Sequence, residues 1–314
     1  MKNFLFKLVL RLSLNSYKTP IRRKIHKAFF KFLQIILFKI KFHIKDIKVD
    51  KNYIKFLNQG FVIIDKKINF NLKIKSKLIN SIRLAKSIFE NEKLQYVKNN
   101  KPYLKNINFH STVNAGKTFY ELFTDDYFLN FAKNYFNDIP LLTEIKLLHS
   151  PITHDNLFTG SQLLHSDHDD NKLMKIFIYL NDVTQESGQL EIVNKYISKR
   201  IMKNSYYRWG QENRKYKSHD DLLLNLYPNN NAINLLIGNK GTIVIADTAN
   251  CLHRGSRNPN KERLVLYATY SSRTSFSHPP INWIFQTKTA SLISSPLMSL
   301  DPIGIYINEI AINN

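Results

Sequence analysis

The chain has 314 residues, of which 43% are hydrophobic, so it can bury a substantial core and is not expected to be disordered over most of its length. Its formal net charge of +22 is compatible with nucleic acid, anionic membranes or acidic small molecules as partners. The single cysteine, Cys251, excludes an intramolecular disulfide and fits a reducing compartment, so we expect a cytoplasmic location.

The first 60 residues are strongly basic, with fifteen Lys or Arg against two Asp. Residues 3–15 and 21–42 both show basic and polar side chains at helical spacing among apolar ones. Neither apolar stretch reaches the roughly 20 residues that a transmembrane helix needs. We therefore expect a basic amphipathic helical extension over residues 1–50. Residues 1–45 are predicted to contact anionic membrane peripherally, at its inner face; the alternative is that they pack on the domain or on another subunit.

Specific nucleic acid binding is not expected. No recognised binding motif accompanies the basic residues, and few polar groups are interleaved with the aromatic ones.

The next part of the chain mixes one short strand with helices. Residues 58–65 are typical of a turn that leads into a strand, and residues 74–95 have a broad apolar helical face. A second helix is predicted over residues 126–137, with Asp125 or Asp126 near its N-cap.

Beyond residue 140 the pattern changes to short apolar or alternating runs separated by Gly, Asn, Asp and Pro. These runs occupy residues 141–148, 173–180, 189–193, 234–237, 242–246 and 264–270. They predict an antiparallel sandwich or barrel, so we expect residues 51–314 to form one mainly β domain with flanking helices. Residues 196–232 are polar, aromatic and basic, which indicates a partly helical insertion of the kind that often covers a site.

His165 and Asp167 are the first candidates for chemistry. In a strand, residues two apart point to the same face, so both side chains can reach one metal ion. A chain with ten histidines produces such pairs by chance, and a surface-loop histidine is the competing interpretation. His253, which follows the predicted strand at 242–246, supplies a second imidazole. Two histidines and one carboxylate can hold Fe(II) on one face and leave the other positions open.

Arg263 opens the last predicted strand, Arg263-Leu-Val-Leu-Tyr-Ala-Thr-Tyr270. An arginine that enters an apolar strand loses hydration unless it meets an anion, and a guanidinium suits a carboxylate through two parallel hydrogen bonds. The alternative is an arginine at the strand edge whose charged end reaches solvent.

With these residues identified, residues 58–280 resemble the phytanoyl-CoA dioxygenase family of Fe(II)/2-oxoglutarate oxygenases. The order and spacing of several motifs carry the resemblance, because none of them is specific alone. In chain order they are Gly60-Phe-Val-Ile63, His165-Ser-Asp167, Ile176-Phe-Ile-Tyr-Leu-Asn-Asp-Val183 with Gly188-Gln-Leu-Glu191, His253-Arg-Gly255, and Arg263. The resemblance implies a double-stranded β-helix, which is a jelly-roll or cupin-like barrel. It also implies that His165, Asp167 and His253 are the catalytic metal ligands.

The resemblance further implies an activity. An enzyme of this kind uses Fe(II), 2-oxoglutarate and O2, with ascorbate as a supporting reductant, to hydroxylate a C–H bond. Arg263 is the implied partner of the 2-oxoglutarate C5 carboxylate. Lys175 and Gln162 are weaker candidates for cosubstrate binding, against the alternatives of an outward-facing lysine and a structural glutamine. Arg254 directly follows His253 and is a further candidate for contact with a carboxylated substrate.

The substrate is expected to be a small molecule, an acyl chain or a glycan or lipid precursor. Two other classes of function stay open from sequence. One is a jelly-roll binding module that keeps the fold without turnover, and the other is a membrane-surface interaction protein in which the N-terminal helices dominate.

Overall fold

The computed structural model describes residues 50–65, 72–91, 96–97, 101–109, 112, 114–137, 140–154, 157–167, 169–204, 219–228 and 232–271. The predicted extension over residues 1–50 lies outside the described residues except for Asp50, so its contact with membrane stays a prediction. Among the helices that the structure describes, none combines the length and the apolar character needed to cross a bilayer.

The described helices are α3 (Lys51–Gln59), α4 (Leu72–Phe89), α5 (Ala115–Phe123), α6 (Asp126–Phe136), α7 (Lys195–Asn204) and α8 (His219–Leu226). The predicted helix at 126–137 is confirmed as α6, and Asp125 caps it by accepting a hydrogen bond from the Tyr127 amide. Helices hold more of the described residues than strands do, so the fold is mixed α/β. The expectation of a mainly β domain was wrong in this respect, because a helical layer packs against one face of the larger sheet.

Within the described residues, ten strands form two antiparallel sheets. The larger sheet has the order β1-β8-β5-β10-β4-β3-β2 and the smaller has the order β7-β6-β9. The strands of the larger sheet are β1 (Phe61–Ile64), β2 (Tyr96–Val97), β3 (Lys105–Ile107), β4 (Leu141–Ser150), β5 (Leu173–Tyr179), β8 (Ile243–Asp247) and β10 (Arg263–Ser271). The smaller sheet contains β6 (Leu190–Val193), β7 (Ile233–Leu236) and β9 (His253–Arg254), and an isolated antiparallel bridge between His165 and His253 extends it.

The chain alternates between these sheets as it winds. It runs from β4 to the bridge at His165, back to β5, across to β6 and β7, and then through β8, β9 and β10 on alternate sides. All the pairings are antiparallel. This winding is a double-stranded β-helix, the kind of barrel that the family resemblance implies.

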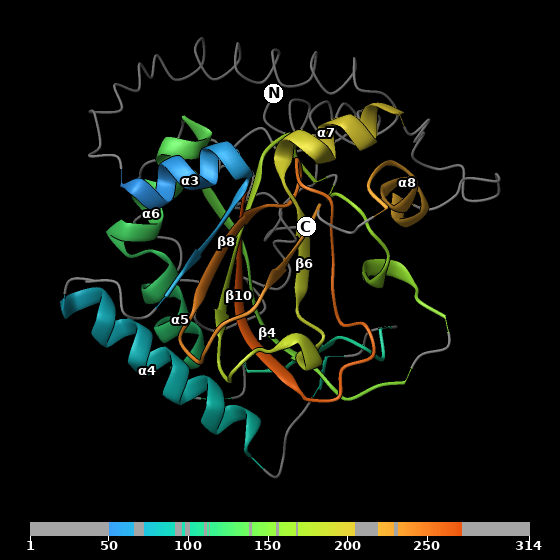
Figure 1. The fold of residues 1–314 in the computed structure, drawn as a ribbon. Coiled ribbons are helices and arrows are strands. Elements are labelled where there is room, and N and C mark those ends of the chain that lie inside the picture. Colours follow the sequence, from blue (N-terminus) through green and yellow to red (C-terminus); the bar gives the residue numbers. More distant parts are fainter. Residues whose placement is uncertain are drawn as a thin grey trace, which may run out of the picture.

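Strand alternation gives the larger sheet two different faces. Its outer face joins α3, α4, α5 and α6 in one apolar core, to which β5 contributes Ile176 and Ile178 (Figure 1). Its inner face joins the smaller sheet in a second apolar core, to which β5 contributes Tyr179 and β10 contributes Val265. Polar side chains on the inner face therefore point into the barrel.

The predicted insertion at 196–232 spans α7 and α8, between β6 and β7 (Figure 1). Residues 205–218 and 229–231 of this stretch lie outside the described residues.

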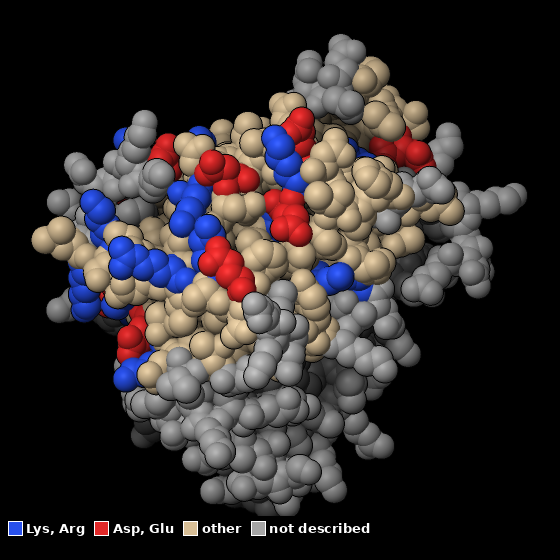
Figure 2. All heavy atoms as spheres, turned by 90° about the horizontal axis from the view of Figure 1, so that it is seen from below, with Lys and Arg blue, Asp and Glu red and all other residues tan. Residues whose placement is uncertain are grey.

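On the face of the molecule seen in Figure 2, basic and acidic side chains of the described residues are intermingled. That part of the surface therefore does not present the continuous basic patch typical of nucleic-acid-binding proteins.

Gly60 connects α3 to β1 at a position that only glycine suits. Its φ of 84° lies in the left-handed region, and an added Cβ would meet the Sγ atom of buried Cys251 at 2.2 Å. We expect Gly60→Ala to lower the free energy of unfolding by about 3 kcal/mol, through steric overlap and backbone strain together. Denaturant unfolding measures this loss.

The double variant Gly60→Ala/Cys251→Ala separates the two causes. Removing the sulfur relieves the overlap but not the backbone strain, so a double-mutant cycle should show partial recovery. A Gly60→Ala protein within about 1 kcal/mol of the wild type would contradict the close packing at this turn.

Candidate metal centre and adjoining cavity

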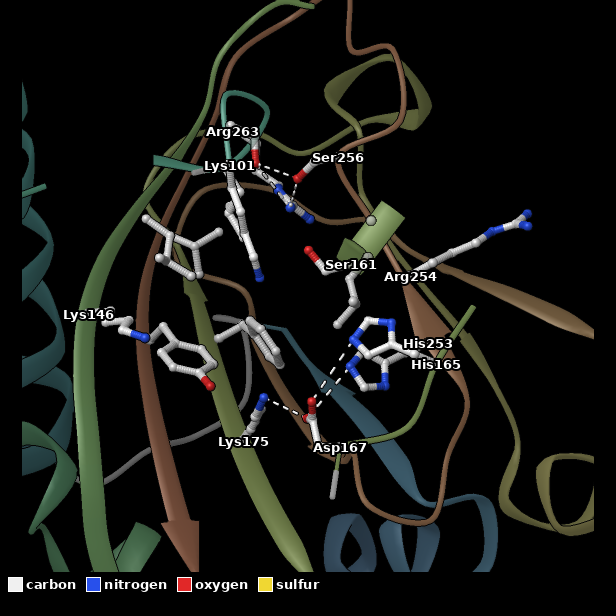
Figure 3. A pocket seen from close by; sticks show the side chains of 18 of the residues that line it. Lys101, Lys146, Ser161, His165, Asp167, Lys175, His253, Arg254, Ser256 and Arg263 are labelled. Atoms are coloured by element: carbon white, nitrogen blue, oxygen red, sulfur yellow. Dashed lines mark hydrogen bonds and ion pairs between the residues drawn. The ribbon is translucent and has the colours of Figure 1, made fainter. Parts of the chain in front are cut away.

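His165, Asp167 and His253 converge at one end of the barrel (Figure 3). One ligand atom from each lies within 4.8 Å of the others. The Asp167 carboxylate oxygens lie 4.0 Å from His165 Nε2 and 3.7 Å from His253 Nε2. Neighbouring ligands on one face of an ion, each about 2.1 Å from it, lie about 3.0 Å apart, so an inward movement of about 1 Å would let all three bind one ion.

Backbone pairing brings together ligands that are far apart in sequence. His165 and His253 exchange two hydrogen bonds, with N···O distances of 3.0 and 2.8 Å, and the Asp167 amide donates to the Thr248 carbonyl at 2.9 Å. The strand-like segment before β5 is thereby joined to the segment that carries the distal histidine.

The tautomers of the two histidines follow from their neighbours. His165 Nδ1 lies 2.8 Å from the Leu163 carbonyl, and His253 Nδ1 lies 3.0 Å from the Cys251 carbonyl. Because a carbonyl oxygen only accepts hydrogen bonds, each Nδ1 must carry the proton. Each Nε2 therefore presents a lone pair toward Asp167. A backbone carbonyl that fixes the ring of a ligating histidine in this way is typical of metal sites.

The protonation states also suit a divalent cation. Burial lowers the pKa of His165, and burial together with His165 lowers the pKa of His253 to about 3. Burial alone would raise the pKa of Asp167, but the Lys175 ammonium and the two imidazoles hold it well below its usual range. Two neutral imidazoles and one carboxylate form the donor set of a non-haem Fe(II) site, so the residues fit that metal.

Lys175 lies on the inner face of β5. Its Nζ is 2.6 Å from Asp167 Oδ2 and 5.6 Å from the centre of the Tyr267 ring. Burial would lower the pKa of Lys175, yet the adjacent carboxylate holds it above its ordinary value. The lysine therefore points inward, as the cosubstrate hypothesis requires, but its partner in this structure is a candidate metal ligand.

A cavity of about 340 Å³ adjoins the three side chains. Its lining includes the candidate ligands and also Arg263, with the guanidinium at one end and the candidate ligands at the other (Figure 3). Phe177 and Leu190 contribute apolar groups to the lining of the cavity.

Arg263 is a buried cation that no acid neutralises among the described residues. It is 8% exposed, so the interpretation of an arginine reaching solvent was wrong. Its Nη2 atom donates to the hydroxyls of Ser150 at 3.1 Å and Ser256 at 3.0 Å. Burial lowers its pKa. Because desolvating a guanidinium without an anion is costly, this end of the cavity is suited to binding a carboxylate.

The structure gives Gln162 a structural setting. Its Oε1 accepts a hydrogen bond from the Thr159 amide at 3.1 Å, and its Nε2 donates to the Ser256 carbonyl at 2.9 Å. The side chain is buried and does not belong to the cavity lining. Any effect on a cosubstrate would pass through Ser256, which contacts Arg263.

Arg254 lines the cavity, but its guanidinium already forms ion pairs with two carboxylates. Its Nε lies 2.7 Å from Glu191 Oε2, and its Nη1 pairs with Asp220. The interpretation that it faces a carboxylated substrate is therefore not supported.

Sequence reasoning missed the two serines that hold Arg263 and the lysines that line the same cavity, Lys101 and Lys146. The alternation of β4 could have indicated Lys146 and Ser150, since both share the inward face with Leu148. No spacing rule indicates Ser256 or Lys101, which reach the cavity from loops.

No protein-family model and no curated protein matches the chain. Several solved structures resemble it. HygX from Streptomyces hygroscopicus, with nickel, 2-oxoglutarate and hygromycin B bound, shares 17% identity over 72% of this chain and 88% of its own, with a TM-score of 0.46. The non-haem α-ketoglutarate-dependent epimerase SnoN from nogalamycin biosynthesis shares 12% over 70% and 82%, with a TM-score of 0.48. EctD from S. alaskensis, with 2-oxoglutarate and 5-hydroxyectoine, shares 14% over 74% and 79%, with a TM-score of 0.47. The activity of this chain is therefore inferred from its own side chains and not from these structures.

Proposed function

We propose that the chain is a non-haem Fe(II)/2-oxoglutarate-dependent oxygenase of the phytanoyl-CoA dioxygenase type. One observation carries the proposal: a two-histidine, one-carboxylate donor set and a buried guanidinium without an acidic partner among the described residues open onto one cavity. The donor set suits Fe(II), and the guanidinium suits the far carboxylate of a dicarboxylic cosubstrate.

When bound, Fe(II) with 2-oxoglutarate and O2 supplies an oxidation that converts 2-oxoglutarate to succinate and CO2 and places one oxygen atom in a substrate C–H bond. His165, Asp167 and His253 would hold the metal. Arg263, with Ser150 and Ser256, would bind the C5 carboxylate. Phe177 and Leu190, as apolar residues of the cavity lining, would help to exclude water from it.

The substrate is proposed to be a small molecule, an acyl chain or a glycan or lipid precursor. The cavity of about 340 Å³ is at the lower end of the size range of small-molecule pockets, roughly 300–1,000 Å³. A small molecule, or the reactive end of a longer chain, fits that size. A binding module without turnover is disfavoured, because binding alone does not require a metal donor set and a carboxylate site in the same cavity.

Succinate formation tests the proposed function. Purified protein with Fe(II), 2-oxoglutarate, O2 and ascorbate is expected to release succinate slowly even without substrate, and omission of Fe(II) should stop the release. Protein that binds Fe(II) and 2-oxoglutarate but yields no succinate under these conditions would favour the binding module instead.

A further inference from the structure

Helix α8 contacts the segment that carries the first candidate ligand. The Asp220 Oδ2 atom accepts a hydrogen bond from the Leu164 amide at 2.7 Å, and His219 Nδ1 donates to the Leu164 carbonyl at 3.0 Å. The first turn of α8 thus binds both backbone groups of the residue that precedes His165. The Leu164 side chain belongs to the same apolar cluster as Leu223 of α8.

The same carboxylate reaches the segment that carries the second histidine. Asp220 Oδ1 pairs with Arg254 Nη1 and lies 2.7 Å from Arg257 Nη2. Arg254 directly follows His253, and its Nε is tied to Glu191 on β6. The Asp220 side chain is 12% exposed, so these charge-assisted bonds are only weakly screened by solvent.

One carboxylate therefore holds the residue before His165 and the residue after His253. The two histidines are also paired directly through their backbones. A shift of α8 is therefore expected to act on both histidines, because Asp220 bonds to a residue next to each of them. Helix α8 lies between β6 and β7, so this influence on the two histidines comes from the predicted insertion.

We propose that Asp220 is a positioning residue for the metal centre, and that through it helix α8 sets the relative placement of His165 and His253. This inference rests on the proposed metal site but not on the identity of the substrate. It assigns the insertion a role in metal binding.

A Co(II) titration of the full-length protein, followed by visible absorbance, tests this role. Asp220→Asn is expected to weaken Co(II) binding by about 10–100-fold and to change the shape of the ligand-field bands, as loss of partners outside the ligand set commonly does. Asp221→Asn is the matched control. It removes the same charge from the same helical turn, but Leu164, Arg254 and Arg257 keep the Asp220 carboxylate, so affinity and spectrum should match the wild type.

A purely structural role for Asp220 would lower the melting temperature of the metal-free protein and leave the Co(II) affinity and spectrum of the folded protein unchanged. That result would overturn the inference. If Asp220→Asn does not fold, Asp220→Glu replaces it. The glutamate retains the charge near Arg254 and Arg257 but is one methylene too long to keep the Leu164 bond in place, so weaker Co(II) binding is again expected, and wild-type binding would overturn the inference.

The failure of the proposed function would look different. In that case the wild-type protein itself would bind Co(II) no better than His165→Ala. Tight binding by the wild type with equal binding by Asp220→Asn would reject only the positioning role.

Discussion

Asp167→Ala is expected to abolish both metal binding and succinate formation. The carboxylate is the only anionic member of the three candidate ligands, and both imidazoles are neutral. Without it, two neutral donors would face a dication beside the Lys175 ammonium. We expect affinity for Fe(II) or Co(II) to fall by more than about 100-fold, because even partners outside the ligand set are worth 10–100-fold. Titration and succinate release measure the two effects.

Glu144→Gln is the matched control for this prediction. Glu144 is a second carboxylate in the lining of the same cavity, where it pairs with Lys146 and does not belong to the ligand cluster. Its replacement should leave metal affinity within a few-fold of the wild type. Equal loss of metal in both variants would mean that the general charge of the cavity binds the ion, and the ligand assignment would fail.

Arg263→Met is expected to have two opposite effects. Two charge-assisted hydrogen bonds to a carboxylate contribute about 1.5–3 kcal/mol each, so 2-oxoglutarate affinity should fall by about 100-fold or more. The ligand-free protein should gain stability, by about 1–3 kcal/mol, because an apolar side chain of similar length replaces a buried charge with no acidic partner among the described residues. Calorimetric titration of 2-oxoglutarate in the presence of Co(II) measures the first effect, and denaturant unfolding measures the second.

Arg263→Lys separates charge from geometry. Lysine keeps the cation but cannot form two parallel bonds, so 2-oxoglutarate affinity should be intermediate and the gain in stability should be absent. If Arg263→Met binds 2-oxoglutarate as the wild type does and unfolds more easily, the side chain has a structural role and the carboxylate site must lie elsewhere.

Local pattern was sufficient to predict several elements and the pairing of His165 with Asp167. The two-residue spacing of His165 and Asp167 placed both on one face, since alternation is a property of any extended chain. Alternation also predicted the strands of the barrel, and the acidic N-cap predicted α6. The weight of the helical layer was underestimated because α3 and α5 were not recognised in the sequence, although all the residues that α5 buries, such as Phe119 and Phe123, are apolar or aromatic.

The sequence by itself determined which donor types are available and in what order: two histidines, a carboxylate and an arginine at the start of a strand. Only the tertiary structure decided which of the polar residues act together. Leu164 and Asp220 are 56 positions apart, and Arg263 and Ser150 are 113 apart, so no local periodicity links them. Gln162 and Arg254 were weaker candidates for binding a ligand, and each of them bonds to partners within the protein. Arg263 found only hydroxyls among the described residues, because the register of β10 against β4 brings Ser150 opposite it inside the barrel. Strand register and burial depend on the whole chain. They therefore decide which side chains remain available to bind a ligand and which already bond within the protein.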